Sequence, residues 1–77
     1  MERARILIVE DEPQLRGLLR LYLERAGHAV SDAGDGAAAL AAFAADRADL
    51  VILDLMLPGM QGEAVLEALR EIGRAHV

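Results

Sequence analysis

The sequence predicts a small α/β unit in which strands and helices alternate and the strands form a parallel sheet. Segments 5–9 and 49–54 carry apolar runs rich in β-branched residues without polar alternation, as expected for strands buried on both faces. After each run, apolar residues recur at steps of three and four, the period of an amphipathic helix. Such alternation favours an open parallel sheet with helices on both faces.

The first strand, 5–9, is followed by a helix with recognisable ends. Pro13 suits the first helical turn, and Gly27 suits the position just after the last turn. The apolar stripe between them is expected to face the core, and it consists of Leu15, Leu18, Leu19, Tyr22, Leu23 and Ala26. The arginines at 16, 20, 25, 47 and 70 are expected on solvated faces or in loop packing.

The same order continues through the rest of the chain. Segment 28–33 is a weaker strand candidate, with His28 at the surface. The turn after it offers Asp35 as the N-cap of an alanine-rich helix reaching Asp46. The third strand, 49–54, ends before a Pro58-Gly59 turn, and a third helical stripe contains Val65, Leu66 and Leu69. The predicted order is βαβαβα.

Composition excludes several classes of function. A length of 77 residues allows one domain or less. The formal charge of -5 disfavours direct binding to nucleic acid or to an anionic membrane. The absence of Cys excludes thiolate metal sites and disulfides. The apolar run 6–9 is far too short for a membrane span, so we expect a soluble, cytoplasmic protein.

Acidic residues follow two of the predicted strands. Glu10 and Asp11 come directly after the first strand and Asp54 ends the third, so these carboxylates converge if the two strands are neighbours. Ligands of open α/β sheets bind at this carboxyl edge. Because clustered carboxylates repel one another, they usually indicate a hard divalent cation, and a water-exposed site with few protein ligands favours Mg²⁺.

A purely structural interpretation of the same acids stays open at this point. Glu10, Asp11 and Glu12 could complement the positive end of the helix dipole, with Asp11 or Glu12 as N-cap before Pro13. Asp54 could simply close a strand as a loop residue.

Three segments together resemble the receiver domains of bacterial two-component response regulators. They are 6–13 (ILIVEDEP), 27–30 (GHAV) and 49–62 (DLVILDLMLPGMQG). The combination of an acidic pair after the first strand with D-x-M-x-P-G-x-x-G after the third is highly specific. The resemblance implies a flavodoxin-like fold, the receiver fold, of which residues 1–71 would be the N-terminal βαβαβα portion.

The resemblance also implies residue roles. Asp54 aligns with the phosphoacceptor, which is the catalytic aspartate, and Asp11 with the acid that binds Mg²⁺ directly. Glu10 aligns with the neighbour that acts through water. Met56 would bind the metal through its backbone carbonyl, together with Asp54, and Pro58 and Gly62 would shape the loop after the acceptor. Gln61 stands where the family often has Asp or a small polar residue.

The implied partner is a sensor histidine kinase, whose phosphohistidine would donate the phosphoryl group. The product would be an acyl phosphate that later hydrolyses, without independent enzymatic turnover. The parent protein could carry a DNA-binding output domain, which this sequence does not contain.

The sequence departs from the family pattern after residue 70. A complete receiver brings Ser or Thr after its fourth strand and Lys after its fifth, whereas this chain has no Lys, no Thr and a single Ser, Ser31, on the second strand. The resemblance therefore implies that the phosphoryl group is held weakly and that switching is impaired in this chain. Residues 72–77 resemble a translated sequencing adapter, so we expect a non-native tail there, which the nucleotide sequence after codon 70 would settle.

Two other classes of function share part of this pattern. A haloacid-dehalogenase-like phosphatase also uses an aspartate after a strand, but it needs a second Asp where this chain has Met56. A pseudo-receiver or protein-binding module without phosphotransfer is the nearer alternative. A nucleotide-binding fragment is disfavoured because no glycine-rich loop follows the first strand.

Overall fold

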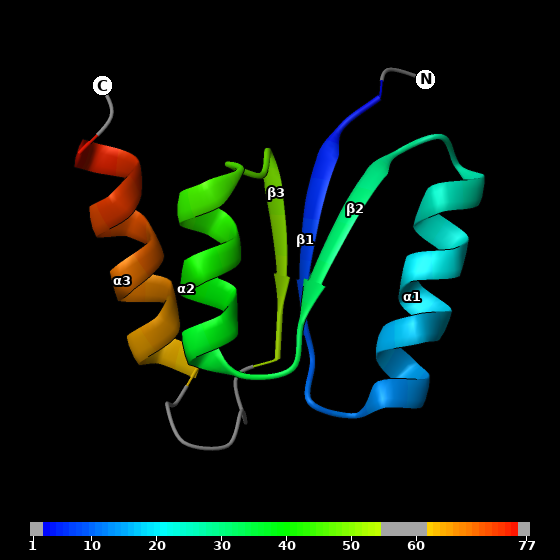
Figure 1. Ribbon diagram of the computed structural model, residues 1–77, viewed down its shortest axis with the longest axis horizontal. Helices are drawn as coiled ribbons and strands as arrows, with labels where there is room; N and C mark the ends of the chain where they lie inside the picture. The colour runs from blue at the N-terminus through cyan, green and yellow to red at the C-terminus, as the bar shows by residue number, and fades with distance from the viewer. Residues whose placement is uncertain (1–2, 55–61, 76–77) are drawn as a thin grey trace.

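The computed structural model describes residues 3–54 and 62–75, and it has the predicted order of elements. In chain order these are β1 (Arg5–Val9), α1 (Pro13–Arg25), β2 (Ala29–Ala33), α2 (Gly36–Ala45), β3 (Leu50–Leu53) and α3 (Gly62–Ala75) (Figure 1). In the part described, no helix is long and apolar enough to cross a membrane.

The three strands form a parallel sheet in the order β2-β1-β3. Leu7 of β1 lies opposite Ser31 of β2 and Val51 of β3. Because β1 has a neighbour on each side, it is the most buried strand, and Leu7 and Ile8 are at most 1% exposed. The carboxyl ends of β1 and β3 therefore lie side by side, as the acidic cluster requires.

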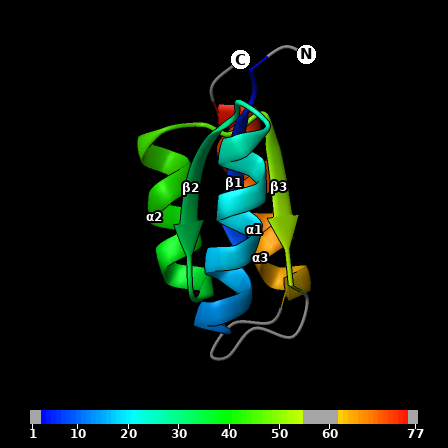
Figure 2. The ribbon, with the colours of Figure 1, turned by 90° about the vertical axis from the view of Figure 1, so that its right-hand side faces the viewer.

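Helices lie on both faces of the sheet, which confirms the predicted fold class. Figure 1 shows α1 on one side of the strands and α2 with α3 on the other, and Figure 2 gives the view from the α1 side. The main core lies between the sheet and the α2/α3 layer and contains Leu7, Val9, Ala33, Ala39, Val65 and Leu69. Successive strand residues face opposite sides, so Ile6 and Ile8 are buried on the α1 side.

The predicted caps are confirmed at two turns. Asp35 caps α2, and its carboxylate accepts the backbone N–H of Ala38 at 2.8 Å. Gly27 follows α1 with a φ of 97°, a left-handed conformation that glycine adopts without steric cost. His28 is half-buried, and its Nδ1 accepts the backbone N–H of Ala4 at 3.0 Å. Its role is structural, although it is less exposed than expected.

The expectation that the whole stripe of α1 forms core is wrong. No residue of α1 is buried, Tyr22 is 62% exposed and Leu18 is 48% exposed. The physical reason is the width of the described sheet, since α1 packs mainly on β2 and β1. Leu19 and Leu23 are partly covered there, whereas the remainder of the stripe is exposed.

The edge of β3 predicts self-association. Among the described strands, β3 pairs with β1 alone, and Leu50 is 54% exposed. An exposed apolar edge strand with unpaired backbone groups is a template for pairing with another chain. We expect the chain to form oligomers at high concentration and Leu50→Lys to shift it towards monomer, as sedimentation velocity would measure.

Ala41→Lys, which adds the same charge on the exposed surface of α2, is the control and should leave the association unchanged. A wild-type chain that stays monomeric and melts cooperatively at high concentration would contradict the prediction.

The packing of α3 can be tested at two adjacent residues. Val65 is fully buried and Leu66 is 38% exposed. Val65→Ala leaves a cavity and should lower the free energy of unfolding by about 2 kcal/mol. Leu66→Ala removes a larger side chain but should cost less than about 1 kcal/mol, because much of its surface is already in water. Urea unfolding followed by circular dichroism measures both, and equal losses would argue against the observed orientation of α3.

Candidate metal centre

Backbone hydrogen bonds tie the ends of the strands together at the carboxyl edge of the sheet. The N–H of Asp54, the residue after β3, donates to the carbonyl of Val9 at 2.9 Å. The N–H of Glu10, the residue after β1, donates to the carbonyl of Ala33 at 3.0 Å. These bonds extend the two ladders by one residue each, so Glu10 and Asp54 begin their loops from fixed and adjacent positions.

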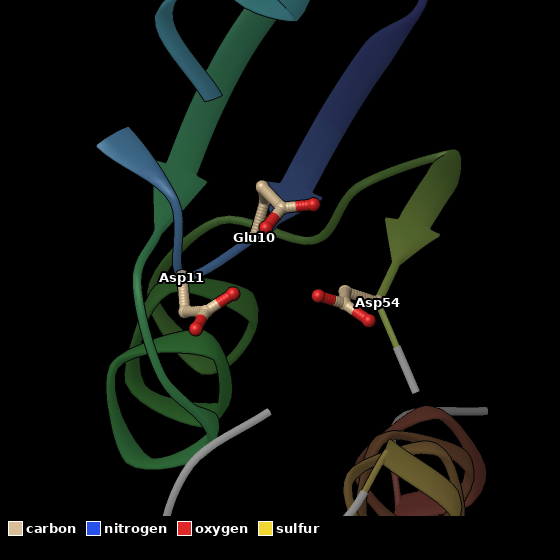
Figure 3. A group of neighbouring side chains, drawn as sticks. All are labelled: Glu10, Asp11 and Asp54. Atoms are coloured by element: carbon tan, nitrogen blue, oxygen red, sulfur yellow. The ribbon is translucent and has the colours of Figure 1, made fainter. Parts of the chain in front are cut away.

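Three carboxylates meet at this edge. Glu10, Asp11 and Asp54 each offer one oxygen, and these three oxygens lie within 4.8 Å of one another. Figure 3 shows the side chains of Glu10 and Asp11, from the end of β1, directed towards the space in front of Asp54. Asp11 is exposed, while Glu10 and Asp54 are half-buried. The cluster is therefore open to water on one side and anchored on the other.

The structure separates the cap of α1 from the cluster. Glu12 is the N-cap, because its carboxylate accepts the N–H of Leu15 at 2.7 Å and of Gln14 at 3.2 Å. Its own N–H donates to Oε2 of Glu10 at 3.1 Å. The structural interpretation of the acidic triplet thus accounts for Glu12. It does not account for Asp11, whose carboxylate lies with the other two in the cluster.

The chemistry of the donors suits a hard cation. All three groups are carboxylates, which are typical ligands of Mg²⁺ and Ca²⁺. Mg²⁺ usually keeps several of its bound waters, so a site with three side chains and one side open to solvent suits Mg²⁺ better than Ca²⁺. Three negative charges so close together repel one another when no cation is bound. The arrangement can bind a divalent ion and, with that charge neutralised, expose one carboxylate oxygen to an incoming anion.

The other predicted site residues are only partly described. Met56 and Pro58 lie outside the described residues, as does Gln61. Gly62 is the first residue of α3. Ser31 lies on β2 and is exposed. Its position on the strand fits the expectation that it cannot supply the hydroxyl that the family places after its fourth strand.

One arginine near the cluster makes a contact whose partner could not be identified from the sequence. Arg16 of α1, expected on a solvated face or in loop packing, lies against the loop after β1, where its Nη1 donates to the backbone carbonyl of Glu10 at 2.8 Å. The available signal was its place in the first turn of a helix, since long helical side chains lean towards the N-terminus and therefore over the preceding loop.

Comparison with known proteins gives consistent results. The response regulator receiver domain matches this chain over residues 6–77. The transcriptional activator protein PfeR of Pseudomonas aeruginosa is 48% identical over 66 residues, which are 86% of this chain and 22% of PfeR. The DNA-binding response regulator MtrA of Mycolicibacterium smegmatis is 48% identical over 68 residues, which are 88% of this chain and 30% of MtrA.

A solved structure shows the same likeness in three dimensions. The chemotaxis protein CheY4 of Vibrio cholerae superposes with a TM-score of 0.89 at 33% identity, covering 95% of this chain and 61% of that one. The chain therefore spans less than a third of these two curated relatives and somewhat under two thirds of this solved neighbour.

The two neighbouring acids, Asp11 and Glu12, should respond in opposite ways to the same substitution. When a chelator keeps the solution free of metal ions, Glu12→Ala should lower the free energy of unfolding by about 1 kcal/mol, because two N–H groups of α1 lose their acceptor. Asp11→Ala should raise it by up to about 1 kcal/mol, since one charge leaves a repelling group. Urea titrations of both variants test this, and destabilisation of similar size in both would show that Asp11 has a structural role.

Proposed function

The chain belongs to the response regulator receiver domain family, and from this membership we propose that it is a phosphoacceptor. In this proposal a sensor histidine kinase transfers a phosphoryl group to Asp54, with Mg²⁺ held at the acidic cluster, in the bacterial cytoplasm. Residues 1–71 would be the front part of the receiver domain, and 72–77 a non-native tail.

The single observation that supports this proposal most strongly is the convergence of Glu10, Asp11 and Asp54 at one edge of the sheet. A lone strand-end aspartate would have no means of accepting a phosphoryl group, because the two anions repel one another. Asp11 and Asp54 would hold the ion, with Glu10 acting through water. When bound, Mg²⁺ supplies charge neutralisation and orientation of the oxygens.

The chemistry assigned to the chain itself is simple. A carboxylate oxygen of Asp54 forms a bond to phosphorus while the bond between phosphorus and the histidine nitrogen of the kinase breaks, and the electron pair of that bond leaves with the nitrogen. The backbone bond from Asp54 to Val9 fixes the strand end that carries the acceptor. Catalysis would come from position and charge, so no independent turnover is expected.

The family also suggests how the signal is used after phosphoryl transfer. MtrA is named a DNA-binding response regulator, and PfeR a transcriptional activator. We propose that the parent of this chain likewise passes its signal to an attached DNA-binding domain, outside the present sequence. Because the chain contains no Lys and no Thr, an acyl phosphate on Asp54 should be short-lived here.

Metal binding provides the first test. Isothermal titration with Mg²⁺ should show binding to the wild type that weakens at least about tenfold in Asp11→Asn and in Asp54→Asn. Asp49→Asn is the matched control, since Asp49 lies at the opposite end of β3 and its carboxylate accepts the N–H of Arg5. Its Mg²⁺ affinity should stay within about twofold of wild type. An Mg²⁺ affinity that is unchanged in Asp11→Asn and Asp54→Asn would refute the proposed site.

Phosphoryl transfer is the second test. Incubation with a small phosphodonor and Mg²⁺ should give an acid-stable, base-labile adduct on the chain, absent in Asp54→Ala and absent with chelator. Intact mass spectrometry after acid quenching detects it. Because the acyl phosphate should be short-lived, only Mg²⁺ binding without any adduct in samples quenched within seconds of mixing would favour a pseudo-receiver. Sustained release of phosphate would favour a phosphatase.

A further inference from the structure

We propose that Arg16 is a positioning residue of the metal centre, which holds the segment Glu10-Asp11 in the orientation that directs Asp11 towards Asp54. This inference rests on the proposed function, since it assumes that the acidic cluster binds a divalent cation. Arg16 is not offered as a ligand, because a guanidinium repels a metal ion.

The contact that carries the inference joins a helix to the loop that precedes it. Arg16 is half-buried in the first turn of α1, and its Nη1 donates to the carbonyl of Glu10 at 2.8 Å. Its backbone N–H also donates to the carbonyl of Glu12 at 2.9 Å, the first bond of the helix. Arg16 therefore links the end of β1 to the start of α1 across the whole connection.

This contact completes the fixation of Glu10. The N–H of Glu10 already donates to Ala33 of β2, so with Arg16 on its carbonyl both backbone polar groups are engaged. The carbonyl of Glu10 belongs to the planar peptide unit that leads into Asp11. Holding this carbonyl fixes the plane from which Asp11 starts. Asp11 is exposed, so this peptide plane is a main constraint on where its side chain can point.

A glycine on the neighbouring turn provides room for the guanidinium. A Cβ added at Gly34, directly after β2, would lie 2.9 Å from Nη1 of Arg16 and 3.6 Å from its Cζ. Among the described glycines, Gly27 has a positive φ and Gly34 does not. Glycine at residue 34 therefore leaves room for the guanidinium and is not required by the backbone conformation. The head of Arg16 is thus enclosed between the β2–α2 turn and the loop that carries Asp11.

Arg20, one turn further along α1, shows what an ordinary anchoring arginine does here. It pairs with Asp32 of β2 at 2.8 Å and with Glu24 at 3.4 Å, and the hydrogen bond with Asp32 raises the pKa of its guanidinium. Arg20 thus fastens the helix to β2 through a charge pair. Arg16 bonds to a backbone carbonyl of the centre itself.

The direction in which Mg²⁺ affinity changes when Arg16 is removed distinguishes a positioning role from a purely electrostatic one. If Arg16 influenced the centre only through its positive charge, its removal would strengthen the binding of a cation. If it positions Asp11, its removal weakens that binding, because part of the binding energy must then order the loop. Outer partners that orient metal ligands typically contribute about 10- to 100-fold in affinity.

The main experiment compares two arginines of one helix. Mg²⁺ titration calorimetry and urea unfolding are performed on the 77-residue chain as wild type, Arg16→Met and Arg20→Met. We expect Arg16→Met to bind Mg²⁺ at least about tenfold more weakly and Arg20→Met to stay within about twofold, although both variants lose stability. Arg16→Lys keeps the charge and can reach the carbonyl with one donor, so it should recover part of the affinity.

A second pair of variants leaves Arg16 in place. In Gly34→Ala the new Cβ must displace the guanidinium, which is the end of a flexible side chain, so the protein should fold normally while Mg²⁺ binding weakens. Gly17→Ala is the control, because a Cβ there meets nothing within 4 Å. This pair decides the question if Arg16→Met does not fold.

The outcomes separate the two proposals. A wild-type chain that does not bind Mg²⁺ overturns the proposed function, and the role of Arg16 with it. A wild type that binds, with Arg16→Met or Gly34→Ala binding equally well or more tightly, overturns the positioning role alone. A parallel loss of affinity in Arg16→Met and Arg20→Met would reduce Arg16 to a general stabiliser.

Discussion

The parallel pairing of β1 with β3 is the constraint on which the rest of the structure depends. It places the carboxyl ends of two strands, separated by more than forty residues of sequence, at the same edge of the sheet. The register continues one residue past β3, because the N–H of Asp54 donates to Val9. A shift of this register by one residue would turn the side chain of residue 54 to the other face of the sheet. The pairing therefore determines both the core and the distance between the acids.

The pairing also imposes a cost that the rest of the fold must offset. Three carboxylates within 4.8 Å repel one another, and their partial exposure softens this repulsion without removing it. The stabilising side of the balance comes mainly from β1, whose apolar residues are nearly inaccessible, and from Val65 and Leu69 of α3. Apolar burial at the centre of the sheet thus supports a polar edge that is unfavourable by itself. Such local conflict between stability and charge is typical of functional sites.

Much of this arrangement could be predicted from the sequence. The apolar run of β1 and the cap at Asp35 have local causes, and both are found where they were predicted. The acids at Glu10, Asp11 and Asp54 could be placed together once the strands were taken as neighbours. The exposure of Tyr22 could not be predicted, because a helical stripe gives the face of a helix but not the width of the sheet below it. The exact partner of Arg16 could not be predicted for a similar reason, since its place in the first turn indicates contact with the preceding loop but not which backbone carbonyl it meets.

The weak apolar contact of α1 gives its polar contacts unusual importance. No residue of this helix is buried, so apolar burial contributes less to its docking than it does for a core helix. Directional bonds then do much to fix the helix relative to the sheet, among them Arg16 on the carbonyl of Glu10 and Arg20 on Asp32. Individually each is worth only about 1 kcal/mol or less at such exposure. The first of these bonds ends on a residue of the acidic cluster, so a contact that docks α1 also holds a backbone group of the metal centre.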